Sequence, residues 1–274
     1  MNRRDWLIIF EEMRKNIKII LCYPLTIVFW VFFPIIWVIP FIFQGRAFVG
    51  SLASSAFKDL TGSAQYIPFV LIGAIVSTYM FSALYGIGNS FRMESYWGTL
   101  EFILGSPAKK IMVILGKAAS EGIFSTFFAT AQIFICIFVF GLEVTLTKFA
   151  PVLFIMLLLL LGLYGMGIGL AGITLQIKES RGIIHALDSL LFLFTPIRYP
   201  VQINPITHAV SLFIPLTYGL VAIRGILLVG RPLSSLLKEI WLLLILDIFL
   251  VGFGLFIFTW LEKRVRKAGT VSHY

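Results

Sequence analysis

Charged side chains are scarce in this sequence. Only 13% of the 274 residues are Asp, Glu, Lys or Arg, about half the share of an average soluble protein. In contrast, 59% of the residues are hydrophobic and the mean hydropathy is +0.98. This balance excludes a soluble domain and predicts an integral membrane protein. The 27 Phe and six Trp residues fit a surface that faces lipid, with aromatic side chains at the interfaces.

Residues and motifs that carry chemistry are also rare. Cys22 and Cys136 lie far apart, each in or beside an apolar run, so they form neither a disulfide framework nor a metal site. The chain has no phosphate-binding loop, because Gly116-Lys117 lacks both the earlier glycine and the Ser or Thr that should follow. Metalloprotease and serine-hydrolase motifs are missing as well. We therefore expect no catalytic residue, no metal site and no cofactor held by this chain.

The apolar residues form long runs, most of them near or above the ~20 residues that cross a bilayer. The expected fold is an all-α integral membrane protein in one transmembrane domain, residues 1–274. Its six transmembrane helices are expected at about 24–43, 66–91, 111–140, 151–176, from 182 onward, and 237–261. In the fourth, Gly165 and Gly169 are spaced to let a neighbouring helix approach closely. We expect that contact inside the subunit, with pairing of two subunits as the alternative.

Two further segments are apolar but do not read as spans. Residues 1–20 have one apolar and one charged helical face, which predicts a helix lying in the membrane interface. Residues 196–232 contain several prolines between apolar stretches too short to cross the bilayer. Non-helical backbone at membrane depth is tolerated only where it is buried in protein or lines a water-filled cavity. We therefore expect re-entrant half-helices near the outer surface.

The basic residues orient the chain. Of the 22 Lys and Arg residues, fifteen fall on the side of the predicted topology that holds both termini, and seven fall on the other side. Cytoplasmic loops are enriched in Lys and Arg, so both termini are predicted to be cytoplasmic. This rule explains the net charge of +9 better than nucleic-acid binding does.

The loop at residues 92–110 is the longest polar and amphipathic segment between two apolar runs. Read as one helix, it places Tyr96, Trp97 and Leu100 on one face. A second, open face carries Glu94, Gly98, Glu101 and Gly105, and Pro107 follows the end of the helix. Such a helix suits the docking of a soluble partner. The alternative is a solvated loop that only joins two spans.

This loop resembles the cytoplasmic loop of ABC-2 type permeases. The matching residues are Arg92, Glu94, Gly98, Thr99, Leu100, Glu101, Ser106 and Pro107. In that family the loop carries the coupling helix, which sits in a groove of the ATP-hydrolysing subunit. The common form has a charged residue before the Gly-Thr, whereas this chain has Tyr96-Trp97. The resemblance thus assigns ATPase coupling to Arg92, Glu94, Tyr96, Trp97, Gly98, Thr99, Leu100, Glu101 and Pro107.

The resemblance also implies a function and a set of partners. It implies the permease subunit of an ATP-driven exporter in the plasma membrane, with an interfacial elbow helix and a re-entrant segment before the last span. Two ATP-binding subunits would carry ATP and Mg²⁺, and a second copy or a related permease would complete the pathway. An aromatic route favours a drug-like or lipid-like amphipathic substrate. The alternatives are a polysaccharide or glycolipid exporter and a lipid-modifying membrane enzyme.

Ionisable residues inside predicted spans are costly and are therefore candidates for function. His185 and Asp188 share a face with Arg181, and Asp247 stands alone in the last span. Each is expected either to line the pathway or to form an inter-helix hydrogen bond. Lys117 and Glu121, four residues apart, favour a local ion pair instead.

Overall fold

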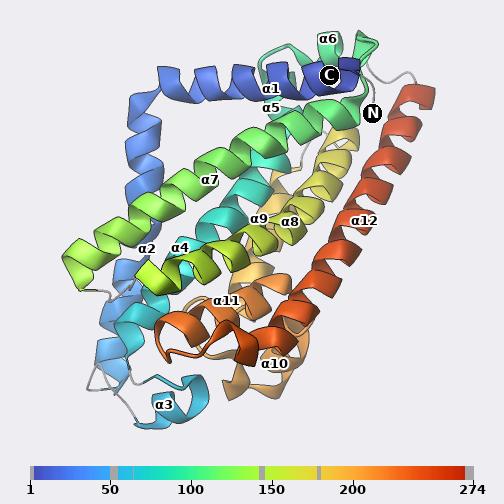
Figure 1. Ribbon diagram of the computed structural model, residues 1–274. Helices are drawn as coiled ribbons and strands as arrows, with labels where there is room; N and C mark the ends of the chain where they lie inside the picture. Colours follow the sequence, from blue (N-terminus) through green and yellow to red (C-terminus); the bar gives the residue numbers. More distant parts are fainter. Residues whose placement is uncertain (1–2, 50–54, 64, 142–145, 178–179, 269–274) are drawn as a thin grey trace.

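The structure, a computed structural model, describes residues 3–49, 55–63, 65–141, 146–177 and 180–268 (Figure 1). The predicted cytoplasmic ends include residues 1–2 and 269–274, which lie outside these ranges. The elements are α1 (Arg3–Cys22), α2 (Pro24–Val49), α3 (Ser55–Thr61), α4 (Tyr66–Phe81), the π-helix η1 (Ser82–Ile87), α5 (Ser90–Tyr96), α6 (Leu100–Gly105), α7 (Lys110–Phe140), α8 (Leu146–Gln176), α9 (Arg181–Phe194), η2 (Val201–Ile203), α10 (Pro205–Ser211), α11 (Pro215–Leu227), η3 (Leu233–Leu236) and α12 (Leu237–Ala268).

The predicted all-α membrane architecture is confirmed. Five stretches in the described ranges are long and apolar enough to cross a membrane: those of α2, α4 with η1, α7, α8 and α12. The pair α10–α11 would make a sixth if counted as one span, although it bends by 96° at its break. The helix at the predicted fifth span, α9, has only 14 residues and is shorter than the ~20 residues that span the hydrocarbon core.

The core of the bundle is centred on α4. Every residue of α4 from Phe69 to Phe81 is buried, because α2, α7, α8 and α11 surround it. The outer helix α12 packs against the second half of α8, from Gly162 to Gly172 (Figure 1). A β-carbon on Gly165 would lie 2.5 Å from the backbone nitrogen of Val251, and one on Gly169 would lie 3.2 Å from the α-carbon of Gly254. These glycines therefore allow close packing inside the subunit, as predicted.

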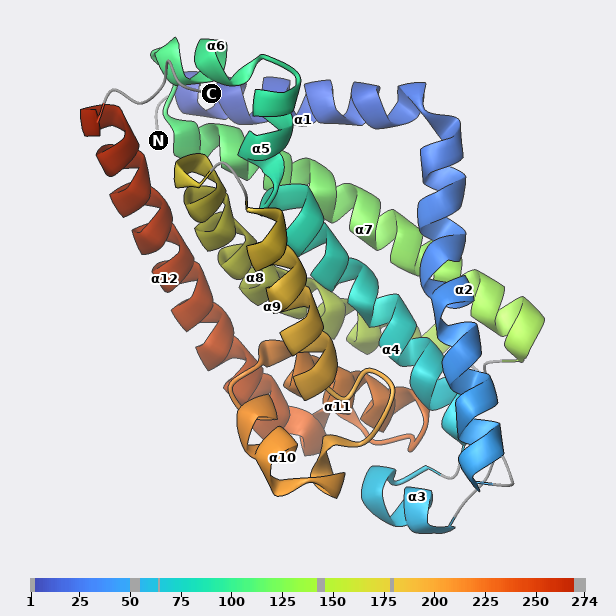
Figure 2. The ribbon, with the colours of Figure 1, turned by 180° about the vertical axis from the view of Figure 1, so that it is seen from behind.

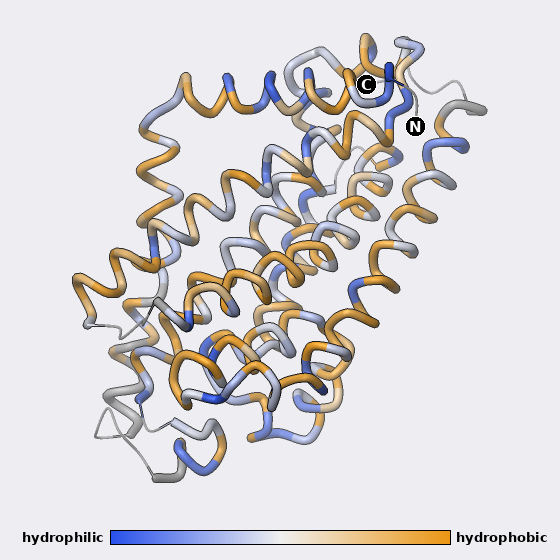
Figure 3. Tube along the Cα trace, in the orientation of Figure 1, coloured by the Kyte–Doolittle hydropathy of each residue, from blue (hydrophilic) through white to orange (hydrophobic). Residues whose placement is uncertain are grey.

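The helix α1 lies across one end of the bundle, and α2 then turns along the bundle (Figure 2). In α1, the apolar side chains Trp6, Leu7 and Phe10 are exposed, whereas the polar residues Asp5 and Asn16 are buried. The tube coloured by hydropathy shows this mixture of polar and apolar positions along α1 (Figure 3). The polar residues Asp5, Glu12 and Asn16 therefore face α7 and the residues just before it. Three residues of the predicted charged face, Arg4, Glu11 and Lys18, are exposed.

The two ends of the bundle differ in what they carry. The elements α1, α5 and α6 gather at one end, where α12 also ends (Figures 1 and 2). The short elements α3, α10 and α11 gather at the other end. We call these the loop end and the broken-helix end.

Candidate functional site

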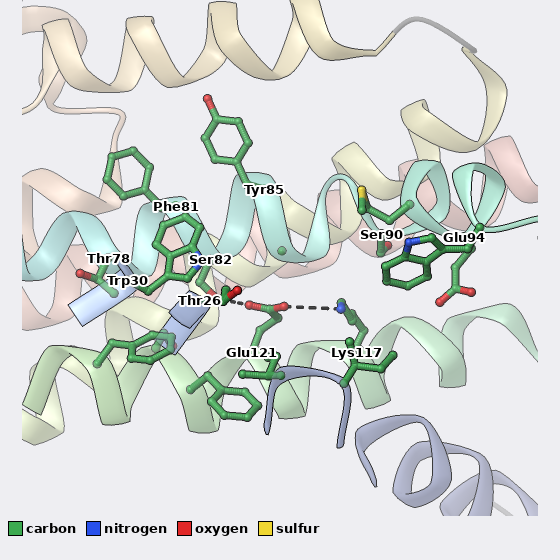
Figure 4. A pocket seen from close by; sticks show the side chains of 18 residues that line it. Thr26, Trp30, Thr78, Phe81, Ser82, Tyr85, Ser90, Glu94, Lys117 and Glu121 are labelled. Carbon is green, nitrogen blue, oxygen red and sulfur yellow. Dashed lines mark hydrogen bonds and ion pairs between the residues drawn. The ribbon is translucent and has the colours of Figure 1, made fainter. Parts of the chain in front are cut away.

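A cavity of about 250 Å³ lies between the loop end and the middle of the bundle (Figure 4). Its wall is mostly apolar and includes the rings of Trp30, Phe81, Phe124 and Phe128. The complete lining comes from α1, α2, α4, η1, α5 and α7: Ile19, Ile20, Thr26, Trp30, Thr78, Phe81, Ser82, Tyr85, Gly86, Ser90, Met93, Glu94, Trp97, Lys117, Glu121, Phe124, Ser125 and Phe128. Such a mixture of aromatic walls and few polar groups is typical of sites for amphipathic small molecules.

The polar part of the cavity is organised by Glu121. Its carboxylate accepts a hydrogen bond from Ser82 Oγ at 3.2 Å and lies 3.6 Å from Lys117 Nζ (Figure 4). The predicted ion pair of α7 is therefore confirmed. The facing residue is Gly86, where a β-carbon would lie 2.5 Å from the carboxyl carbon of Glu121. The absence of a side chain at Gly86 thus lets the carboxylate lie against the surface of η1.

A chain of polar contacts links this ion pair to α1. Lys117 Nζ donates to Asn16 Oδ1 at 2.9 Å, and Asn16 Nδ2 donates to Glu12 Oε1 at 2.9 Å. Glu12 in turn pairs with Lys15, one helical turn away, at 2.8 Å. The polar face of α1 thus runs along α7 from the cavity to the loop end.

The chain of contacts continues into the loop. Lys15 Nζ also lies 2.8 Å from Glu94 Oε1, and the other oxygen of Glu94 accepts a hydrogen bond from Thr99. Burial lowers the pKa of Lys15, but hydrogen bonds and charge attraction from Glu12 and Glu94 outweigh it, so the net pKa is raised. We call the set Glu94, Lys15, Glu12, Asn16, Lys117 and Glu121 the polar relay.

The loop itself differs from the predicted single helix. The helix α5 ends at Tyr96, Gly98 adopts a φ of +70°, and α6 begins only at Leu100. The prediction that Glu94 shares an open face with Glu101 is therefore wrong, since Glu94 is only 8% exposed. The physical reason is the left-handed turn at Gly98, which breaks the helical register and lets Thr99 bond back to Glu94.

The remaining loop residues separate into anchors and an exposed surface. Leu100 is buried and Arg92 is half-buried. The backbone carbonyls of Ser106 and Ala108 accept hydrogen bonds from the buried Lys110 and so close the loop. The exposed residues of the predicted set are Tyr96, Trp97, Gly98, Thr99, Glu101 and Pro107.

The loop presents aromatic side chains to the outside. Tyr96 is 82% exposed and Phe102 is 80% exposed, with Trp97 and Glu101 also exposed between them. Trp97 also lines the cavity. Several large exposed apolar side chains in one short loop indicate contact with protein or membrane. We call Tyr96, Trp97, Glu101 and Phe102 the docking surface. Phe102 was not among the predicted site residues, although its position next to Glu101 could have indicated it.

The structure brings His185 and Asp188 together through a residue that the sequence did not single out. The hydroxyl of Tyr85 lies 3.0 Å from His185 Nδ1 and donates to Asp188 Oδ2 at 3.0 Å. This contact ties α9 to η1. A search of the described ranges finds no group of three or more His, Cys, Asp or Glu side chains arranged to hold a metal ion.

Asp247 is separate from the cavity and from the Tyr85 cluster. It is 2% exposed in α12, and neither carboxylate oxygen has a hydrogen-bond partner in the described residues. It packs on α8 at Gly162, where a β-carbon would lie 1.8 Å from Asp247 Oδ1. The predicted inter-helix hydrogen bond is not formed at this position.

Comparison with known proteins agrees with this arrangement. No curated protein sequence matches the chain. A family model described as ABC-2 type transporter matches residues 13–228, which include α2, the loop, the cavity and α11. Because this match covers well over half of the sequence, the chain belongs to the ABC-2 type transporter family.

Proposed function

We propose that this protein is the permease subunit of an ATP-driven ABC exporter that moves an amphipathic, drug-like or lipid-like molecule out of the cytoplasm. The observation that carries the proposal is the continuity of the polar relay. It connects the exposed loop to the wall of an aromatic cavity through side chains of α1 and α7. A permease needs such a connection, because the ATP site lies in another subunit.

The docking surface supplies the contact with an ATP-binding subunit. Tyr96, Trp97 and Phe102 offer aromatic area, and Glu101 offers charge to basic residues of the partner. Two such subunits would hold ATP and Mg²⁺ between them. Aromatic residues are enriched among those that dominate binding energy at protein interfaces. The positive-inside rule supports a cytoplasmic position for the loop end in the plasma membrane.

The relay suggests how movement is transmitted. When the ATP-binding subunits close, the loop moves, and Glu94 carries Lys15 and α1 with it. Asn16 then acts on Lys117 and changes its pairing with Glu121 at the cavity wall. The aromatic rings contact the apolar part of a substrate, while Ser82 and Glu121 contact its polar part. A second permease copy would form the other wall of the pathway.

The alternatives are less well supported. A polysaccharide can stack the C–H faces of its sugars on aromatic rings, but its many hydroxyl groups need polar partners, and the wall of this cavity is mostly apolar. A lipid-modifying enzyme needs acidic or histidine side chains that converge on a reacting group. His185 and Asp188 instead converge on the Tyr85 hydroxyl and join two elements of the fold.

The test is purification of the tagged protein from mild detergent together with its native partners, followed by an ATPase assay. We expect a stoichiometric ATP-binding subunit to co-purify. Phe102→Ala and Glu101→Arg should each reduce its recovery and the ATPase activity at least about fivefold, the size expected when an interface anchor worth about 1 kcal/mol or more is removed. The matched control is Phe213→Ala, which removes an equally exposed Phe (79%) at the broken-helix end.

Each outcome has a defined meaning. Loss with both loop variants and retention with Phe213→Ala support the docking assignment. Equal retention in all three variants would show that this surface does not bind the ATPase. Purification of the protein alone, without ATPase activity, would contradict the exporter function itself. Amphipathic compounds that stimulate the ATPase of the intact complex would then identify the substrate class.

A further inference from the structure

Arg224 is a buried cation at the broken-helix end, far from the docking surface. It lies in α11 and is only 6% exposed. Its Nε and Nη2 donate to the backbone oxygen of Phe69 at 3.2 and 2.7 Å, Nη2 also donates to Ile197 O at 2.9 Å, and Nη1 donates to Pro196 O. All these acceptors are neutral carbonyls. No carboxylate in the described part of the chain pairs with Arg224.

The surroundings of Arg224 are shaped to hold it. The guanidinium carbon lies 3.4 Å from the ring centre of Phe69. A β-carbon at Gly73 would lie 2.0 Å from Ile197 O and 2.9 Å from Arg224 Nη2, so only glycine permits this approach. The arginine thus fastens α4, α11 and the segment after α9 together. These contacts satisfy hydrogen bonds but leave a positive charge without a counter-charge.

A buried charge without a partner of opposite sign is costly, because neutral dipoles replace only part of its hydration. A guanidinium has five N–H groups, and the bonds to carbonyls use four of them. One N–H of Nη1 therefore remains for a further acceptor.

A cavity beside Arg224 offers the space for that acceptor. It measures about 270 Å³ and lies between α3, the start of α4, the segment after α9, and α11 with the turn that follows it. Arg231 provides a second guanidinium and Gln202 provides an amide. Asp59 is the one carboxylate that lines it, so the charged side chains of the lining sum to +1.

We propose that this cavity, the Arg224 pocket, binds a phosphate-type anion, either the headgroup of a phospholipid or a free phosphate ion. Arg224 supplies a fixed positive charge at the base, and Arg231 closes on the anion from the exposed rim. Gln202 donates a further hydrogen bond. Planar guanidinium groups are well matched to phosphate oxygens, and their charge-assisted hydrogen bonds are stronger than neutral ones. The inference does not depend on the exported substrate or on the ATP-binding partner.

The experiment measures ligand-dependent melting of the purified full chain in neutral detergent, followed by Trp fluorescence. One arm titrates sodium phosphate against sodium chloride at equal ionic strength. The other adds phosphatidylglycerol or phosphatidylcholine to the micelles. A ligand that binds only the folded protein raises its melting midpoint in proportion to occupancy. We expect phosphatidylglycerol, inorganic phosphate or both to raise the midpoint, and neither chloride nor phosphatidylcholine to match them.

The decisive variant is Arg231→Gln, because Arg231 is exposed and its loss leaves the Arg224 contacts intact. It should weaken the apparent affinity about tenfold, as expected for loss of a charge-assisted hydrogen bond. The matched control, Lys238→Gln, removes one exposed positive charge that does not line the pocket, and should leave the affinity unchanged.

The two arms distinguish the sources of the anion. A response to inorganic phosphate, with or without one to phosphatidylglycerol, assigns a site open to the free ion, and a response to phosphatidylglycerol alone assigns a lipid headgroup site. Absence of any response in the unmodified protein, or equal effects of Arg231→Gln and Lys238→Gln, would overturn the proposal. Arg224→Gln is expected to lose binding as well, but it also removes the bonds to Phe69, Pro196 and Ile197.

Discussion

The contact between α8 and α12 leads to a sharp prediction about two glycines of one helix. Gly254 faces α8, and a β-carbon there would lie 1.9 Å from the backbone oxygen of Gly165. Gly252, two residues earlier in α12, has nothing within 4 Å of the same position. The substitutions Gly254→Ala and Gly252→Ala add the same methyl group to the same helix. Only the first meets a neighbour.

The expected difference follows from the geometry. A carbon and an oxygen in contact are separated by about 3.4 Å, so the methyl group added by Gly254→Ala would force the two backbones apart by roughly 1.5 Å at this point. Overpacking of this kind costs about 1–3 kcal/mol, and the better helix propensity of Ala offsets about 1 kcal/mol of it. In Gly252→Ala no neighbour is met, so only the gain in helix propensity remains. The propensity gain is common to both variants, so they should differ by the overpacking cost, about 1–3 kcal/mol in the free energy of unfolding, whichever value the unmodified protein has.

The assay is thermal unfolding of the purified variants in one detergent, with size-exclusion chromatography to confirm that each is monodisperse. For a chain of this size, about 1 kcal/mol shifts the midpoint by about 2–4 °C, so we expect Gly254→Ala to melt about 2–12 °C below Gly252→Ala. Equal midpoints for the two variants would refute the inference that α8 and α12 are held in backbone contact at Gly165.

Two other predictions concern polar groups. In a double-mutant cycle of Lys15→Met and Glu94→Gln, the losses of ATPase-coupled transport should be non-additive, with a coupling energy below about 1 kcal/mol, because Lys15 is 37% exposed and solvent screens the pair. Additive losses would show that the two residues act separately. Asp247→Asn should lower the melting midpoint by no more than about 2 °C, because neither oxygen of Asp247 has a partner to lose within the described residues and Asn has nearly the same shape. A large drop would show that the carboxylate pairs with a group on another molecule.

The membrane class of the fold could be predicted from composition and from the lengths of the apolar runs. Helical structure was expected for those runs because a bilayer leaves no other partner for backbone N–H and C=O groups within a single segment. The Lys117–Glu121 pair and the role of Gly165 and Gly169 were also predictable, because each depends on spacing along one helix. The loop was recognisable from Gly98-Thr99-Leu100-Glu101, which lies within the segment matched by the ABC-2 family.

Residues that act through distant neighbours could not be identified from their spacing. Glu94 was expected on an open face, yet it is buried and pairs with Lys15, 79 positions away. Tyr85 joins His185 and Asp188 across about a hundred residues, and nothing in its local sequence distinguishes it from other aromatic residues. Arg224 similarly depends on the carbonyl of Phe69, 155 positions earlier.

The sequence by itself thus determined that this is a helical membrane protein, where its long apolar helices lie, and to which family it belongs. Hydropathy and motif spacing are local properties, so they can be read along the chain. Only the tertiary structure decided that the polar face of α1 packs against α7, that the loop breaks at Gly98, and that Arg224 lines a pocket without a paired carboxylate in the described part of the chain. These features arise from contacts between segments far apart in sequence. Each buried polar group needs a hydrogen-bond partner, and the local sequence pattern does not specify which distant residue provides it.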